Sequence, residues 1–554
     1  MTAVRLCILS ALVASPLTAD ELGPVETQTK VSATAGITGI GSADNFGAAV
    51  ASINDVDGDG VVDVAVGVPG GDDGGTSRGE VRIVFLNPDG SVKGQQAISS
   101  TEGGFTGVLD DLDFFGSSVA GLGDHDLDGT PDLIVGAPGD DDGGNKRGAL
   151  WVLFLNPDGT VKAHQKISEL EGGFVGGAQP VEALGLALGF AGDVDGDGIG
   201  DVAAGTPAAG LASGAKQAGL FLLFLNLDGT VKAEQEIGDG VGGFTGDIED
   251  SDEFGRSITT LGDLDGDGPP DLAVGAPGDK DGGGKRGAVW ILFLNGDGTV
   301  KSQQKISSTE GGFTGQLKNG GDFGASIANV RDLDDDDLGD LAVGAPGDGP
   351  GSIWLIFLMA DGTVEDWAKI ESNDATFRGA LEGADEFGAG VASLGDHDGN
   401  TVTDLFVGAP GDDDGELDAG AGYSLFLRGP SETPQLGSGV NPNVFVPGSQ
   451  PPVIGKVWNP VVVEVAGDGK SILHVLGMSR EPAPLIPVDN DELLISTAPG
   501  DLIFRQAVAV DKNFFFPIPD DPQLVGLELF TQGGIIKSSG ELILTNGLDI
   551  VIGF

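Results

Sequence analysis

Asp55-Val-Asp-Gly-Asp-Gly-Val-Val-Asp63 is the stretch of sequence that decides the fold, because it returns five more times along the 554-residue chain. The further copies begin at Asp124, Asp193, Asp263, Asp332 and Asp396, so successive copies lie 69, 69, 70, 69 and 64 residues apart. A repeat of nearly constant length predicts an array of similar supersecondary units, in which neighbouring units bury each other's apolar surface.

Each repeat carries four short segments of β-strand character, and the fourth repeat shows them most clearly. They cover residues 254–262, 271–277, 287–294 and 299–307. The Asp-rich loop joins the first two segments, and Asn295-Gly-Asp-Gly298 predicts a hairpin turn between the last two. Short strands with glycine-rich turns and no helical periodicity predict an all-β fold, in which each repeat forms one blade of a β-propeller.

Two further motifs recur in a fixed register. Phe-Gly opens five repeats, beginning at Phe46, Phe115, Phe254, Phe323 and Phe387, and Gly-Ala-Pro ends the second strand of four, beginning at Gly136, Gly275, Gly344 and Gly408. These motifs resemble the FG-GAP repeat of the integrin α-subunit propeller, over about residues 26–428. The third repeat departs most, with Leu184-Gly185 and Gly205-Thr-Pro207. The propeller of that family has seven repeats, whereas this chain has six copies.

The two ends of the repeat array indicate how the ring closes. The sixth repeat ends at residue 427 without a fourth strand, whereas Gln28-Thr-Lys-Val-Ser32 matches the fourth strand of other repeats, such as Gln165-Lys-Ile-Ser168. We therefore predict six blades, with residues 26–34 as the outer strand of the last blade, because this pairing covers the sheet edge that the sixth repeat would otherwise expose. A seventh blade built from the C-terminal segment is the alternative.

The nonapeptide itself predicts a metal-binding loop. Carboxylates at positions one, three, five and nine repel one another unless a cation lies between them, and glycine at position six permits a tight turn. All-oxygen ligation favours Ca²⁺ over Mg²⁺, and the strand that follows at once excludes an EF-hand. Several calcium ions are therefore expected. The four complete ligand sets are Asp55, Asp57, Asp59 and Asp63; Asp124, Asp126, Asp128 and Asp132; Asp193, Asp195, Asp197 and Asp201; and Asp263, Asp265, Asp267 and Asp271.

The last two loops depart from this pattern. Their candidate ligands are Asp332, Asp334, Asp336 and Asp340 in the fifth loop, and Asp396, Asp398, Asn400 and Asp404 in the sixth. Asp337 and Thr401 replace the glycine at position six, and Asn400 replaces an aspartate at position five. The pattern thus favours calcium more strongly in the first four loops. The alternative for every copy is an ordinary Asp-Gly turn without an ion.

Other charged residues have simpler interpretations. A second acidic cluster follows the proline of four repeats, at residues 72–73, 140–142, 279–281 and 412–414. Three of these clusters precede Arg78, Arg147 or Arg286, which favours local ion pairs in solvated loops over a further cation site. His125 and His397 occupy position two of their loops and are expected to point to solvent.

The segments outside the repeats predict an exported protein. Arg5, the apolar run 6–13 and small residues up to Ala19 predict a signal peptide over residues 1–19. The single cysteine, Cys7, lies within it, which excludes disulfides from the exported chain. Residues 429–455 are predicted to be a linker, and 456–554 a small β-rich, sandwich-like domain. No segment reaches the roughly 18 apolar residues of a membrane helix, so we expect a secreted or cell-surface location.

The net charge and the missing catalytic motifs exclude several classes of function. The net charge of −58 disfavours nucleic acid and anionic membranes as partners. The sequence lacks a nucleophile elbow, a zinc-binding His pair and a catalytic cysteine, so an enzyme is not expected. We expect a calcium-binding scaffold for adhesion or binding, whose ligand is an extracellular protein or glycan. The alternative is a calcium-dependent extracellular polysaccharide hydrolase or lyase.

Overall fold

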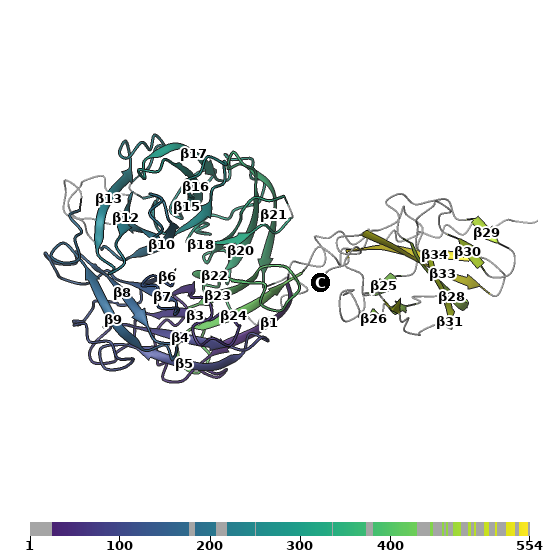
Figure 1. Cartoon of the computed structure of the whole chain (residues 1–554), viewed down its shortest axis with the longest axis horizontal. Helices are drawn as coiled ribbons and strands as arrows, with labels where there is room; N and C mark the ends of the chain where they lie inside the picture. The colour runs from purple at the N-terminus through teal and green to yellow at the C-terminus, as the bar shows by residue number, and fades with distance from the viewer. Residues whose placement is uncertain are drawn as a thin grey trace, which may run out of the picture. The chain divides into compact units, whose positions relative to one another are not determined.

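The computed structural model describes residues 25–428, apart from 177–182, 207–218, 250, 335 and 373–380, and beyond them only the strands β25 to β34. The chain divides into two compact units, of which Gly23–Leu427 is the β-propeller (Figure 1). The predicted signal peptide, residues 1–19, lies outside the described residues.

Six four-stranded antiparallel sheets form the propeller, and each sheet is one blade. Within a blade the strands run in order from the centre to the rim, as β6 to β9 do in Figure 1. The first three blades are β2 (Ala49–Ser52), β3 (Val64–Val68), β4 (Glu80–Leu86), β5 (Val92–Ile98); β6 (Ser118–Gly123), β7 (Asp132–Ala137), β8 (Ala149–Leu155), β9 (Val161–Ile167); and β10 (Ala187–Gly192), β11 (Asp201–Thr206), β12 (Gly219–Leu225), β13 (Val231–Gly238).

The remaining three blades repeat this order. They are β14 (Ile258–Gly262), β15 (Asp271–Ala276), β16 (Ala288–Leu294), β17 (Val300–Ile306); β18 (Ser326–Arg331), β19 (Asp340–Ala345), β20 (Ser352–Leu358), β21 (Val364–Glu371); and β22 (Gly390–Gly395), β23 (Asp404–Ala409), β24 (Ala421–Leu427), β1 (Val25–Ser32). The predicted all-β propeller with six blades is confirmed.

The N-terminal strand closes the ring, as the sequence predicts. β1 pairs antiparallel with β24, from Ser32 opposite Ala421 to Val25 opposite Leu427. It thereby becomes the outer strand of the last blade, and the described strands form no seventh blade. The strands that the structure describes beyond residue 428 pair only with one another.

The Phe-Gly and Gly-Ala-Pro motifs meet at the junctions between neighbouring blades. Phe115 is fully buried and forms a parallel bridge to Gly79 of the preceding blade. The carbonyl oxygen of the next residue, Gly116, lies so close to Gly67 that a Cβ there would collide with it. The same contact recurs at all six junctions, including Gly408 with Gly47 between the last blade and the first. The two motifs therefore exist because two backbones approach closely at each junction.

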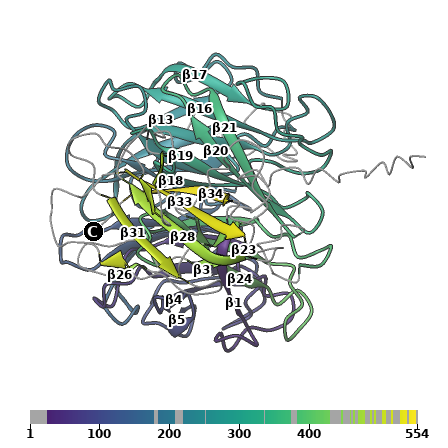
Figure 2. The ribbon, with the colours of Figure 1, turned by 90° about the vertical axis from the view of Figure 1, so that its right-hand side faces the viewer.

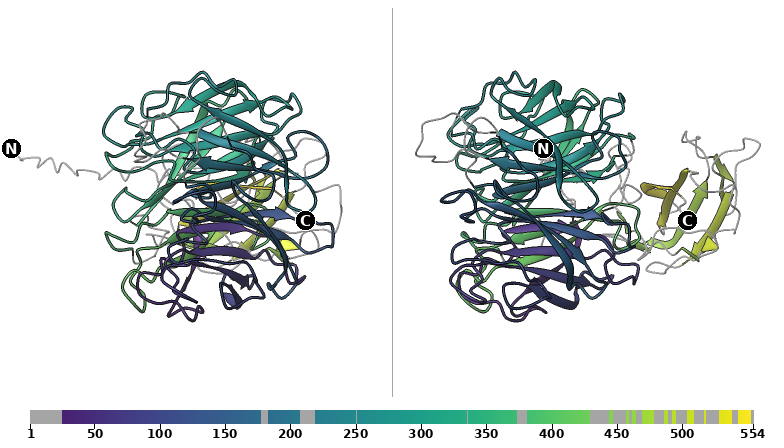
Figure 3. Two further views of the ribbon diagram at one scale, coloured as in Figure 1. Left: turned by 90° about the vertical axis from the view of Figure 1, so that its left-hand side faces the viewer. Right: turned by 60° about the vertical axis from the view of Figure 1, so that its left-hand side comes forward.

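The apolar side chains of the strands form the core between neighbouring blades, and Figure 3 shows the strands from two further sides. The third strand of each blade is buried along nearly its whole length, which explains its continuous apolar run. The inner strands line a central cavity of about 470 Å³, as expected for a propeller. Each blade contributes one aliphatic side chain at the same position of its inner strand: Val50, Val119, Leu188, Ile258, Ile327 and Val391.

Residues 428–554 belong to the other compact unit. Its strands are β25 (Val444–Val446), β26 (Val457–Trp458), β27 (Val461–Val463), β28 (Gly469–Gly477), β29 (Ile486–Val488), β30 (Glu492–Leu494), β31 (Ile503–Val508), β32 (Phe516–Pro517), β33 (Glu528–Lys537) and β34 (Leu542–Val551). The largest sheet has the order β31-β28-β33-β34 (Figure 2). β25 falls inside the segment predicted as a linker, and the sandwich over 456–554 stays a prediction. In the described part of the chain, no helix has the length and apolarity needed to span a membrane.

Candidate metal centre

Each Asp-rich nonapeptide forms the loop between the first and second strands of its blade. In the first, second and fourth loops the carboxylates at positions one, three and nine offer oxygens within 4.8 Å of one another. In the third and fifth loops the same holds for positions one, three and five. Three of the four predicted ligand residues are thus brought together in each of these five loops, and positions one and three belong to every cluster.

The aspartate at position nine anchors the loop to its blade. Asp63 is 1% exposed, and its two oxygens accept backbone N–H groups from Val56 in the loop and Leu86 in the third strand, both at 3.1 Å. Asp132, Asp201, Asp271, Asp340 and Asp404 accept the equivalent pairs of bonds at 2.8–3.2 Å. Burial raises the pKa of Asp63 to about 7 and that of Asp271 to about 6.

The aspartate at position one shapes the turn. Asp55 accepts the N–H groups of Gly58 at 2.8 Å and Gly60 at 2.7 Å, and Gly60 has φ 90°. Such a φ explains the preference for glycine at position six. Asp337 and Thr401 take its place with φ 69° and 76°, so the fifth and sixth loops keep the conformation at a cost in backbone strain.

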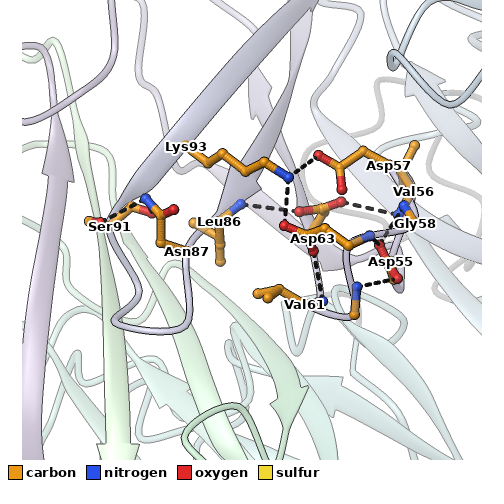
Figure 4. A network of polar contacts seen from close by, with 12 residues as sticks. Asp55, Val56, Asp57, Gly58, Val61, Asp63, Leu86, Asn87, Ser91 and Lys93 are labelled. Atoms are coloured by element: carbon orange, nitrogen blue, oxygen red, sulfur yellow. Dashed lines mark hydrogen bonds and ion pairs between the residues drawn. The ribbon is translucent and has the colours of Figure 1, made fainter.

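A lysine that the sequence analysis did not single out completes the first four loops (Figure 4). The Lys93 ammonium lies 2.6 Å from Asp57 Oδ2 and 2.5 Å from Asp59 Oδ2. This ion pair lowers the pKa of Asp59. Lys301 repeats these distances with Asp265 and Asp267. Lys162 pairs with Asp126 and Asp128, and Lys232 with Asp195 and Asp197.

The geometry of the first loop fits a hard divalent cation. Asp57 Oδ1 is buried and has no hydrogen-bond partner among the described residues. A buried carboxylate oxygen without a partner is costly, and a cation held by the neighbouring carboxylates would satisfy it. The donor set consists of oxygens alone, which suits Ca²⁺ or Mg²⁺ better than a softer metal.

The sixth loop is built differently at position five. Asn400 Oδ1 accepts the Val402 N–H at 2.8 Å, and its amide nitrogen donates to the Leu427 carbonyl at 2.7 Å. The same nitrogen lies 3.4 Å from Asp398 Oδ2. The amide thus directs its N–H₂ group, and not a free oxygen, toward the neighbouring carboxylate.

Three of the four second acidic clusters are paired with lysines of the outer strands and not with the arginines that follow them, whereas in the first cluster Asp73 accepts hydrogen bonds from Ser99 and Thr101. Lys166 lies 2.8 Å from both Asp140 and Asp142, and 5.2 Å from the centre of the Trp151 ring. The equivalent groups are Lys305 with Asp279, Asp281 and Trp290; Lys369 with Asp348, Glu371 and Trp354; and Lys30 with Asp412, Asp414 and Tyr423. The interpretation as ion pairs is supported, but the aspartate next to each ring is buried and not solvated.

The arginines of these loops bind the following segment of the chain instead. Arg78 lies 2.9 Å from Asp111, and Arg286 donates to Asn319 at 2.9 Å. The expectation for the two histidines is also wrong. His125 is 4% exposed and donates to the Asn226 carbonyl of the next blade at 3.0 Å, and His397 donates to the Asn87 carbonyl at 2.9 Å. Both histidines therefore link neighbouring blades.

Comparisons with known proteins agree with this architecture. The FG-GAP repeat family matches residues 46–84, 115–153 and 254–292, in the first, second and fourth blades. The chain is 36% identical over 158 residues to integrin alpha-PS5 and 32% over 226 residues to integrin alpha-PS2, both of Drosophila melanogaster. It is 31% identical over 194 residues to integrin alpha-3 of Cricetulus griseus. These matches cover 28%, 39% and 35% of this chain, but only 15%, 14% and 17% of the relatives.

One solved structure, a fungal alcohol oxidase of the AA5 family in complex with copper, aligns over 96% of this chain and 100% of its own. Its sequence identity is 11% and its TM-score 0.31, which is too low to support an inference.

The fold and the repeated loops together define a class of protein. A closed ring of blades, joined through Phe-Gly and Gly-Ala-Pro contacts and carrying an acidic loop in each blade, is an FG-GAP propeller. The chain carries FG-GAP repeats in this propeller and is similar over part of it to integrin α subunits.

Proposed function

We propose that the protein is a secreted FG-GAP propeller that binds several calcium ions and acts as an extracellular scaffold for adhesion or binding. The observation that carries the proposal is the carboxylate cluster that recurs at the same place in successive blades. Its oxygens are close enough to share one cation, and Asp57 Oδ1 is buried and available to it. The similarity to integrins supports a binding role with an extracellular protein or glycan as the partner.

Removal of the metal tests the calcium part of this proposal. Calcium that binds the folded loops and not the unfolded chain raises stability by roughly 3 kcal/mol per site at a hundredfold excess over Kd. We expect the melting temperature to fall in EDTA and to recover with Ca²⁺ better than with Mg²⁺. Differential scanning calorimetry measures both effects, and a melting curve that ignores EDTA would contradict calcium binding.

A calcium-dependent polysaccharide hydrolase or lyase is the second candidate. It is favoured by a pocket of about 560 Å³ over the second blade, which gathers Asp110, Trp151 and His164. Asp140 and Asp142 in the same pocket are held by Lys166, and a paired carboxylate is a poor general acid or base. We therefore propose binding and not catalysis. A glycan array tests binding, and release of reducing ends from polysaccharides, lost on Asp110→Asn, would instead support the enzyme.

A further inference from the structure

The lysine that faces the acidic loop comes from the same structural position in each of the first four blades. The hairpin between the third and outer strands contains a β-bulge, because Leu86 pairs with Val92 and Phe85 with Gly94, which leaves Lys93 unpaired. The other four hairpins, and the pairing of β24 with β1 in the last blade, have the same irregularity. A bulge leaves one residue out of the ladder and redirects its side chain, here toward the loop that the ninth aspartate anchors.

The identity of this bulge residue divides the loops into two groups. In the first four blades it is a lysine, at positions 93, 162, 232 and 301. In the last two blades it is Glu365 and Glu26. The change coincides with the loops whose position six is not glycine. Loops with the complete motif thus carry a lysine, and loops with the altered motif carry a further carboxylate.

The lysine contacts two of the carboxylates that a bound cation would use. The Lys93 and Lys301 ammonium groups contact the carboxylates at positions three and five, at 2.5 and 2.6 Å. An ammonium is a compact charge with three donors, and it partly offsets the repulsion between the carboxylates. The side chains of Lys93 and Lys301 are 38% and 40% exposed, so they have room to leave when a divalent ion arrives.

The fifth loop has no such counter-ion among the described residues. Its carboxylates at positions one, three and five lie within 4.8 Å of one another, as in the third loop. Asp337 keeps the left-handed conformation of the glycine it replaces, and its N–H bonds to Asp332 at 2.7 Å. The turn is therefore preserved while the local negative charge is greater.

We propose that the four lysines are resident counter-ions that compete with calcium in the first four loops, and that the fifth loop, where Glu365 replaces the lysine, binds calcium most tightly. This inference rests on the proposed calcium binding. It reverses the order expected from the motif alone, which favours the complete loops. At low calcium the fifth loop fills first, and the lysines hold the other four loops in shape until the concentration rises.

Calcium titration of the full chain after treatment with EDTA tests the inference. We compare the wild type, Glu365→Lys, the quadruple variant with Lys93, Lys162, Lys232 and Lys301 changed to Gln, and Lys146→Gln. The last variant removes one positive charge from an exposed loop of the second blade and controls for net charge. Isothermal titration calorimetry gives the affinities, and melting curves in EDTA give the stability of each calcium-free protein.

Glu365→Lys should abolish the tightest class of sites and leave a protein that is no less stable in EDTA. The quadruple variant should tighten the weaker class by about tenfold, equivalent to about 1.4 kcal/mol per site, and should melt at a lower temperature in EDTA. Lys146→Gln should do neither. Calcium affinities that change less than twofold in both test variants would overturn the role of the lysines alone. No calcium binding to any variant would overturn the proposed function as well. Because Glu365→Lys adds a favourable charge to the loop, the test does not depend on the folding of the quadruple variant.

Discussion

Within one loop, single residues at neighbouring positions have different tasks. Asp271 gives both oxygens to buried backbone N–H groups, of Leu264 and Leu294, whereas Asp265 faces the exposed ammonium of Lys301. Asp271→Ala leaves two buried donors unpaired, at about 1–3 kcal/mol each, so it should destabilise the protein both in EDTA and in calcium. Asp265→Ala should matter mainly in calcium, because exposed ion pairs contribute less than about 1 kcal/mol. Melting curves of both variants in the two buffers separate these roles. If Asp271→Ala leaves the melting temperature in EDTA unchanged, Asp271 does not anchor the loop.

Gly275 shows why glycine is needed at the junction between two blades. A Cβ at this residue would strike the carbonyl oxygen of Gly324 in the next blade, and a backbone atom cannot rotate away. We expect Gly275→Ala to cost at least about 2 kcal/mol, within the range for overpacked sites. Gly284 in the same blade has open space around it, and Gly284→Ala should change stability by less than about 0.5 kcal/mol. Urea unfolding followed by tryptophan fluorescence compares the two variants. Equal losses of unfolding free energy would show that the close contact of Gly275 with Gly324 is not what limits substitution there.

At the scale of elements, β1 decides whether the ring is closed. It supplies the outer strand of the last blade, and Lys30 pairs with Asp412 and Asp414 across that blade. Deletion of residues 25–34 should expose the edge of β24, lower the melting temperature and promote association between molecules. A synthetic peptide of residues 23–34 should restore the melting temperature by pairing with the open edge. Light scattering and calorimetry measure both effects, and a deleted protein that stays monomeric and equally stable would contradict closure by this strand.

For the whole molecule, the buried aspartates make stability depend on pH in a defined direction. Burial raises the folded-state pKa of Asp63, Asp340 and Asp404 to about 7, from the ordinary value of 3.8. Between these values the folded state binds more protons than the unfolded state, so stability falls as pH rises through this window. In EDTA the melting temperature should therefore be higher at pH 5.5 than at pH 7.5. Saturating calcium should reduce this gain, because protons and calcium compete for the same oxygens. A lower melting temperature at pH 5.5 than at pH 7.5 in EDTA would contradict the raised pKa of these buried aspartates.

The ring could be predicted from the repeat. Its periodicity, its turn residues and the additional outer-strand sequence at Gln28–Ser32 are all visible in the sequence without knowledge of contacts between distant residues. The lysines were not predicted, because Lys93 reaches Asp57 only through the register of a hairpin and its bulge. A signal was present: Val-Lys follows the hairpin turn in four repeats, and Val-Glu takes its place at Val364. The burial of His125 was missed for a similar reason, since its partner Asn226 belongs to another blade.

The pairing of β1 with β24 also has a consequence for synthesis. Val25 pairs with Leu427, so β1 leaves the ribosome about four hundred residues before the strand with which it pairs. Five blades can form one by one as they emerge, whereas the last must wait for both ends of the array, and such distant pairings form slowly. Until then β1 stays unpaired and can pair with the β24 edge of another nascent chain. A slow, concentration-sensitive final step is thus the kinetic counterpart of a last blade that is built from both ends of the array.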